Sequence, residues 1–140
     1  MTARASSVMP KIVTMAYRVS KSRFEELVEQ ALDRLPARFA EFLEEVPVEI
    51  RSRSTPALRR QAGVGHDDLL LGLYHGRPLT ERSVEDSGRL PDVIYVFQED
   101  VELACDNEQE LIEQVRITVL HEIGHLFGLT EDDLNQLGYG

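Results

Sequence analysis

Hydrophobic residues recur at helical spacing in two parts of the chain. Apolar side chains repeat every three or four residues over 24–35, which is the pattern of an amphipathic helix. Ser22, with Glu25 three residues later, is predicted to cap this helix. A second and longer helix is predicted over 108–127, where the apolar residues share one face. Gly128 follows it, as expected of a glycine that ends a helix.

Three segments between these helices have the pattern of β-strands. Residues 46–50 alternate between apolar and polar, and Pro47 favours a strand at a sheet edge or a strand start. Residues 69–74 form a second apolar segment, and the β-branched and aromatic run at 93–97 is typical of a buried central strand. Residues 51–68 are rich in Arg, Ser and Gly and predict a long loop of the kind that is often functional.

Shorter segments complete the pattern. Pro36 is expected either to break the first helix or to stand in the first turn of a second helix, which would bury Phe39, Phe42 and Leu43. The residues between 97 and 108 are expected to form another loop. Near the end of the chain, Thr130 is predicted to cap a last short helix, with Asp133 in the reciprocal capping position.

These elements predict one α+β domain. The chain has 140 residues, of which 42% are hydrophobic and 29% charged, within the range of globular proteins. A chain of this length buries roughly two thirds of its unfolded surface, enough for a core without disulfides or metal. We expect a compact domain over 21–140, with a small mixed sheet of three to four strands packed on the 108–127 helix and on N-terminal helices. Residues 1–20 are expected to be a loose extension with one short strand at 12–15.

Charge and cysteine content narrow the function classes. Lys and Arg number 15 and Asp and Glu 25, which gives a formal net charge of −10 and argues against a nucleic-acid partner. Cys105 is the only cysteine, so an intramolecular disulfide and a thiolate zinc cluster are both excluded. The apolar run at 12–16 is too short to span a membrane and lacks a cleavage pattern. We therefore expect a cytoplasmic protein with neither a membrane nor a nucleic-acid partner.

One pentapeptide carries the pattern of a metal site. His121 and His125 are four residues apart in the longest predicted helix, so their imidazoles lie on one helical face and can bind the same metal ion. Glu122 lies about 100° around that helix, where a general base must be to take a proton from a metal-bound water. The pattern predicts one zinc ion per chain, with Glu122 as the catalytic residue.

A catalytic zinc site needs a third protein ligand. Gly128 allows the chain to turn back toward the metal, and Glu131, Asp132 and Asp133 follow. Acidic residues are also favoured in the first turn of a helix by the helix dipole alone. The residues by themselves therefore leave open whether any of these three carboxylates is a ligand.

The chain resembles the small bacterial zincin-like metallopeptidases, also called mini-zincins, over most of its length. The resemblance is carried by 24–36, by 70–83, by 90–92 and by 118–129. That family has the pattern HExxHxxGxxD, which implies a compact zincin-like α+β core and zinc held by two histidines and the last residue. This chain has Glu131 at the last position. Glu131 is therefore the predicted third ligand, and its longer side chain leaves Asp132 as the alternative.

The resulting hypothesis is a zinc-dependent metallopeptidase that hydrolyses peptide bonds through a zinc-activated water, with a peptide or protein as substrate. An extended substrate is expected to add to an exposed sheet edge. Tyr74, His75 and Arg77 are candidates for transition-state hydrogen bonds, and the sequence does not select among them. Two alternatives are a non-catalytic zinc-binding protein and, less favoured because of Glu122 and the acidic charge, a metal-dependent endoribonuclease.

Overall fold

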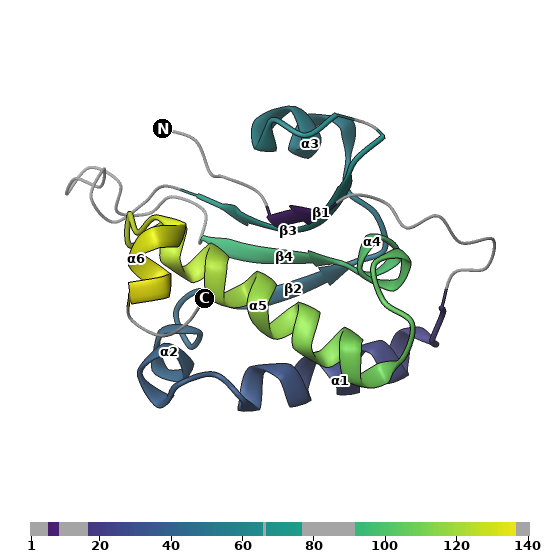
Figure 1. The fold of residues 1–140 in the computed structure, drawn as a ribbon, viewed down its shortest axis with the longest axis horizontal. Coiled ribbons are helices and arrows are strands. Elements are labelled where there is room, and N and C mark those ends of the chain that lie inside the picture. Colours follow the sequence, from purple (N-terminus) through teal and green to yellow (C-terminus); the bar gives the residue numbers. More distant parts are fainter. Residues whose placement is uncertain (1–5, 9–16, 66, 77–91, 137–140) are drawn as a thin grey trace.

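The computed structural model describes residues 6–8, 17–65, 67–76 and 92–136 (Figure 1). The described strands are β1 (Ser6–Val8), β2 (Val48–Arg51), β3 (Leu69–His75) and β4 (Val93–Phe97). The described helices are α1 (Lys21–Asp33), α2 (Ala37–Phe42), α3 (Pro56–Ala62), α4 (Gln98–Leu103), α5 (Glu108–Leu126) and α6 (Glu131–Gln136). The predicted α+β class is confirmed.

The four strands form one mixed sheet in the order β1-β3-β4-β2. β3 is antiparallel to both β1 and β4, whereas β2 is parallel to β4. β4 therefore lies inside the sheet, as its continuous apolar run predicts. β2 lies at an edge, which is the position that the neighbouring Pro47 indicates.

The two faces of the sheet are covered by different helices. α5 crosses one face and contacts both β3 and β4, and α1 packs against α5 on the same side (Figure 1). The core on this side includes Phe24 of α1 and Val119 of α5, both with no exposed surface. α3 lies on the opposite side, where Leu58 packs against Leu70 and Phe97. The long helix with the candidate site is thus fixed between the sheet and a second helix.

A bulge in β3 changes the direction of its side chains. Ser6 pairs with Gly72 while Ser7 pairs with Leu70, so two steps along β3 match one step along β1. Leu71 is the additional residue. Leu71 packs in the core on the α5 side, and a Cβ on the next residue, Gly72, would also point at α5. From Gly72 onward the side chains again point alternately to the two faces of the sheet, so Tyr74 also points to the α5 side.

The predicted long loop at 51–68 is wrong, because α3 forms inside it. The Thr55 hydroxyl accepts a hydrogen bond from the Leu58 amide at 3.1 Å, and Pro56 occupies the first turn. Gly63 ends the helix with a φ of 73°. A cap, an initial proline and a left-handed glycine are local helix signals, so the sequence from Thr55 to Gly63 does indicate this helix.

Two further local predictions are wrong. α4 forms in the expected loop between 97 and 108, because Val101 is buried in the core and the Asp100 carboxylate accepts a hydrogen bond from the Leu70 amide at 2.7 Å. The cap of α1 is Ser20, not Ser22: the Ser20 hydroxyl accepts a hydrogen bond from the Arg23 amide at 3.1 Å. Ser22 is the second residue of α1, within its first turn, and so does not occupy the capping position that precedes the helix.

The N-terminal region contributes to the fold at two described places. β1 joins the sheet at residues 6–8, where no strand was predicted. Val19 is tied to α4 by two hydrogen bonds, from its amide to Glu102 at 3.1 Å and from Gln98 to its carbonyl at 3.2 Å. The strand predicted at 12–15 lies outside the described residues, and the boundary between an extension and a domain at residue 20 stays a prediction.

No helix in the described part of the chain is long and apolar enough to cross a membrane.

Candidate active site

The support of the candidate site is α5, which ends where the sequence predicts. At its start, the Asn107 side chain accepts a hydrogen bond from the Glu110 amide at 2.9 Å. At its end, Gly128 has a φ of 75°, and the Leu129 amide donates to the Gly124 carbonyl at 2.8 Å. This is the Schellman arrangement, which closes the last turn of a helix. The His-Glu-Ile-Gly-His segment therefore lies entirely in regular helix.

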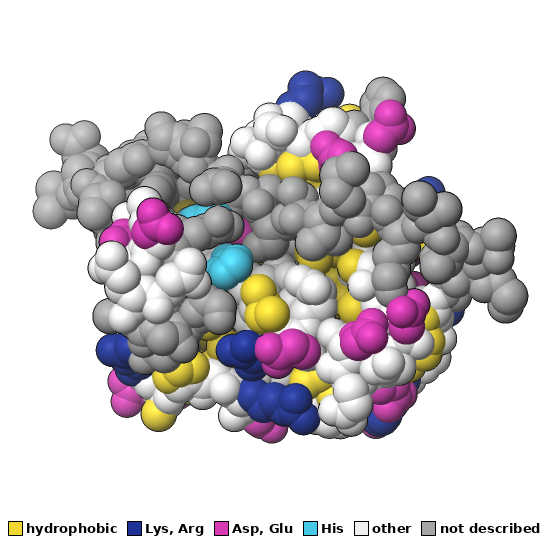
Figure 2. All heavy atoms as spheres, in the orientation of Figure 1, with side chains coloured by type: hydrophobic (Ala, Val, Ile, Leu, Met, Phe, Trp, Pro, Cys, Tyr) yellow, Lys and Arg dark blue, Asp and Glu magenta, His cyan; other side chains and the backbone are white. Residues whose placement is uncertain are grey.

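The three motif side chains lie in different environments along the last turns of α5. Glu122 has no exposed surface, whereas His121 and His125 are partly buried. Oε1 of Glu122 accepts a hydrogen bond from the Tyr74 amide of β3 at 2.8 Å. Histidine side chains reach the surface over this end of α5, beside the residues drawn in grey (Figure 2). Glu122 thus lies against the sheet, with the histidines nearer to solvent.

The motif residues fit a zinc ion. Nδ1 of His125 is buried and has no hydrogen-bond partner among the described residues. It lies 3.5 Å from Oε1 of Glu122 without forming a hydrogen bond to it. An unpartnered buried ring nitrogen is costly in a metal-free protein, whereas a neutral imidazole nitrogen is a preferred zinc ligand. Histidine nitrogens on one helical face beside a carboxylate are thus a donor set that suits zinc.

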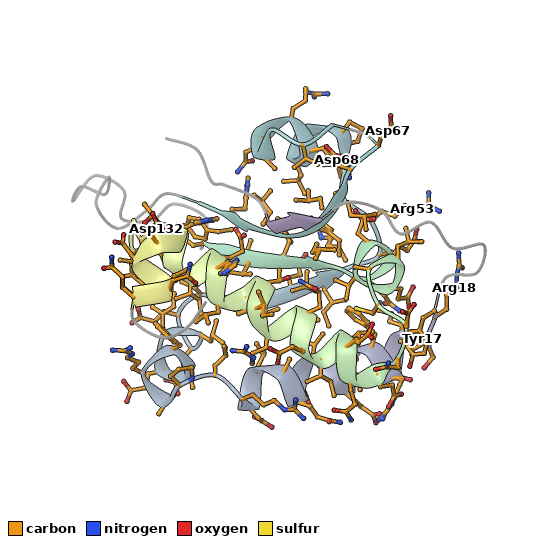
Figure 3. All side chains as sticks on the ribbon, viewed as in Figure 1. Tyr17, Arg18, Arg53, Asp67, Asp68 and Asp132 are labelled. Atoms are coloured by element: carbon orange, nitrogen blue, oxygen red, sulfur yellow. The ribbon has the colours of Figure 1, made fainter. Side chains whose placement is uncertain are left out.

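The third ligand is not settled by the described residues. Glu131 is the first residue of α6, and its side chain lies outside what the structure describes. Asp132 follows it and is exposed (Figure 3). Among the described side chains, no group of three His, Cys, Asp or Glu residues is placed to hold a metal ion. Glu131 and the alternative Asp132 therefore stay predictions.

The third acidic residue, Asp133, takes part in the N-terminal cap of α6. The Asp133 carboxylate accepts a hydrogen bond from the Thr130 amide at 2.9 Å, and the Thr130 hydroxyl accepts one from the Asp133 amide at 3.1 Å. This is the predicted reciprocal cap, and it occupies the Asp133 side chain. Leu134 is buried and packs over Gly124, which docks α6 against the motif segment of α5.

Of the three candidates for transition-state hydrogen bonds, the structure brings Tyr74 to the motif. Tyr74 reaches Glu122 through its backbone amide, a group that sequence reasoning did not consider. His75 is on the other side of the sheet, where its Nδ1 lies 3.1 Å from Oε1 of Gln61 in α3. Arg77 lies outside the described residues. The sequence indicates this contact only in that residue 74 belongs to a predicted strand, whose backbone amides can donate hydrogen bonds to side chains.

Comparison with known proteins gives one finding that bears on identity. No curated protein matches the chain. The family model described as zincin-like metallopeptidase matches residues 43–140. This range is more than half of the chain, and it includes β2, β3, β4 and the helix with the two histidines. The chain therefore belongs to the zincin-like metallopeptidase family.

Proposed function

We propose that this protein hydrolyses peptide bonds with a zinc ion held by His121, His125 and Glu131, or by Asp132 in place of Glu131. Membership of a metallopeptidase family supports a hydrolase. The observation that carries the proposal is the unpartnered Nδ1 of His125 next to the fully buried carboxylate of Glu122. A ligand nitrogen and a base in contact on one helix are the parts that metal-assisted hydrolysis requires.

Glu122 is the proposed general base. When bound, zinc supplies a Lewis acid that polarises a carbonyl and acidifies water. The Glu122 carboxylate takes the proton of the attacking water and then returns it to the leaving amine. The hydrogen bond from the Tyr74 amide orients this carboxylate, and its burial keeps bulk water away from it. Both effects favour proton transfer in a fixed geometry.

The substrate is proposed to be an extended peptide that adds to the edge of β3. Among the described residues, β1 pairs with β3 only as far as Gly72. Tyr74 and His75 continue the strand beyond that point, and Tyr74 contacts Glu122. The Tyr74 amide donates to Glu122, so a peptide paired with this edge would form its main-chain hydrogen bonds with other backbone groups of the strand. Its backbone would then lie beside the general base.

The proposal is tested by measuring zinc content and cleavage on the same preparations. The untagged wild-type chain is expected to hold about one zinc per chain by plasma mass spectrometry, as a structural or catalytic zinc site does. His121→Ala is expected to lose the metal. Glu122→Gln is expected to keep it and to cleave a peptide library at least about 100-fold more slowly.

The two variants also separate the alternatives. A wild-type chain that binds zinc but cleaves nothing in the library would be a non-catalytic zinc-binding protein. Glu122→Gln that cleaves at the wild-type rate with metal bound would remove Glu122 from the mechanism. Absence of zinc from the wild type after loading would end the metallopeptidase proposal for this chain.

A further inference from the structure

β3 and α5 approach each other closely at Gly72. A Cβ at this position would lie 2.5 Å from Cγ2 of Thr118 in α5 and 2.8 Å from the carbonyl oxygen of Tyr95 in β4. Carbon atoms in contact are about 3.5–4.0 Å apart, so a side chain at residue 72 would separate the helix from the strand. The absence of a side chain at Gly72 thus sets how near α5 can come to the sheet.

The second contact between the same two elements is the hydrogen bond to Glu122. Tyr74 is two residues beyond Gly72 in β3, which is about 6.6 Å along a strand. Glu122 is four residues beyond Thr118 in α5, which is about 6 Å along a helix. The two steps match in length, so the Gly72–Thr118 contact and the Tyr74–Glu122 hydrogen bond at 2.8 Å are neighbours along one line of contact.

The bulge at Leu71 makes this arrangement possible. Without the additional residue, strict alternation along β3 would turn Gly72 and Tyr74 to the face that Leu70 occupies, on the α3 side. With it, both residues face α5. The bulge, the glycine and the hydrogen bond therefore act together on the position of one side chain in α5.

We propose that Gly72 is a positioning residue for Glu122. Because Gly72 has no side chain, Thr118 packs directly against β3. This packing holds the Glu122 carboxylate within hydrogen-bonding distance of the Tyr74 amide. This inference rests on the proposed function, because Glu122 is the general base only if that proposal holds. A carboxylate with one oxygen fixed presents the other in a defined direction, which matters because small displacements of a reacting group lower the rate strongly.

The test follows the Tyr74 amide by NMR in the full chain as purified. Glu122→Ala is expected to shift the Tyr74 amide proton and to speed its hydrogen exchange at least about tenfold, because the hydrogen bond to the Glu122 side chain is lost. Gly72→Ala is expected to cause the same change at Tyr74, together with a change in β4 near Tyr95, whose carbonyl oxygen the new Cβ would meet at 2.8 Å. Gly65→Ala is the matched control, because its new Cβ would meet Oδ2 of Asp68 at an ordinary 3.6 Å.

Rescue distinguishes positioning from general destabilisation. Thr118→Ser removes the methyl carbon that would meet the new Cβ, so the double variant Gly72→Ala with Thr118→Ser is expected to recover part of the Tyr74 protection. A Gly72→Ala chain that keeps the wild-type shift and exchange rate at Tyr74 would overturn the proposal. So would a Tyr74 amide that does not respond to Glu122→Ala.

A second pair of variants applies if Gly72→Ala does not fold. Thr118→Val keeps the methyl carbon that packs on Gly72 and should leave the Tyr74 amide unchanged. Thr118→Ser removes this methyl carbon and should speed hydrogen exchange at the Tyr74 amide. The same exchange rate in both would overturn the proposal. Because the measurement is made on the Tyr74 amide, it does not depend on cleavage. Failure of the peptidase proposal would leave the result at Tyr74 valid, and failure of the positioning proposal would leave the peptidase proposal unaffected.

Discussion

At the scale of single residues, two buried polar atoms on α5 stand out. Oγ1 of Thr118 and Nδ1 of His125 are both buried without a hydrogen-bond partner among the described residues. Glu122 lies between them in sequence, and its Oε1 accepts a hydrogen bond from the Tyr74 amide. A buried polar atom without a partner lowers stability. At His125 a metal ion would offset that cost, whereas at Thr118 nothing described does.

We predict that Thr118→Val leaves stability unchanged or raises the free energy of unfolding by about 1 kcal/mol. Valine has nearly the same shape and keeps the contact with Gly72, while the unpartnered hydroxyl is removed. Thr130→Val is the control, because that hydroxyl caps α6 and its loss should cost about 1 kcal/mol. Urea denaturation of both variants measures the difference. A drop of 1 kcal/mol or more in Thr118→Val would show that its hydroxyl has a partner.

At the scale of elements, α1 and α5 are joined at their N-terminal ends by a bidentate ion pair. Nε and Nη2 of Arg23 donate to the two carboxylate oxygens of Glu108 at 2.8 and 2.6 Å. The hydrogen bonds that Arg23 donates lower the pKa of Glu108, and the acceptance of these bonds by the Glu108 and Glu26 carboxylates raises the pKa of Arg23. Both side chains of the pair are more than a third exposed, so its contribution to stability is small.

The lowered pKa of Glu108 predicts how this contribution depends on pH. A carboxyl group with a lower pKa in the folded state stabilises the fold fully above its ordinary pKa. That stabilisation is lost as the pH falls through the lowered value. Glu108→Gln should therefore have a lower melting temperature than wild type at pH 7, and the gap should close on acidification. Thermal melts from pH 7 to pH 2 follow the gap.

Glu26→Gln is the matched control for that series. It removes the other carboxylate of Arg23, at 2.8 Å, but this pair lies within α1 and joins no two elements. Its effect on the melting temperature at pH 7 should be smaller than that of Glu108→Gln. Equal effects of the two variants, or a gap for Glu108→Gln that persists at low pH, would contradict a role of the ion pair in joining the helices.

At the scale of the whole molecule, the fold has a core that does not depend on the candidate metal site. The larger hydrophobic cluster joins α1, α5, β3 and β4, and a smaller one fills the space between the sheet and α3. The two histidines lie at one end of α5, at the margin of the larger cluster. Burial of apolar surface in these two clusters is the main source of stability.

We predict that the metal-free chain stays folded. Treatment with a chelator should leave one cooperative thermal transition, with the far-ultraviolet circular dichroism unchanged at 25 °C. Zinc at about 100 times its dissociation constant should add about 2.7 kcal/mol, the amount expected from binding to the native state alone. The His121→Ala chain should show no response to zinc. Unfolding on chelation would instead assign the metal a structural role, as in a small zinc domain.

Local interactions explain what the sequence alone predicted. The helix over 24–35, the bounds of α5, the cap of α6 and the place of the histidines on one helical face follow from contacts within about four residues of each other. The same local rules would have found α3 from Thr55, Pro56 and Gly63. Such features are determined by the sequence because the interacting groups are neighbours along the chain, whatever the rest of the fold does.

Only the tertiary structure decided how Glu122 meets the sheet. The Tyr74 amide and the Glu122 carboxylate are 48 residues apart, and the bulge at Leu71 depends on pairing with β1. α4 likewise owes its place to burial of Val101 and to the hydrogen bond from Leu70 to Asp100. Periodicity shows that a residue is apolar or polar, but not which distant group it will meet. Tertiary packing determines which distant groups meet, because the contact between Thr118 and Gly72 exists only after α5 and β3 have come together.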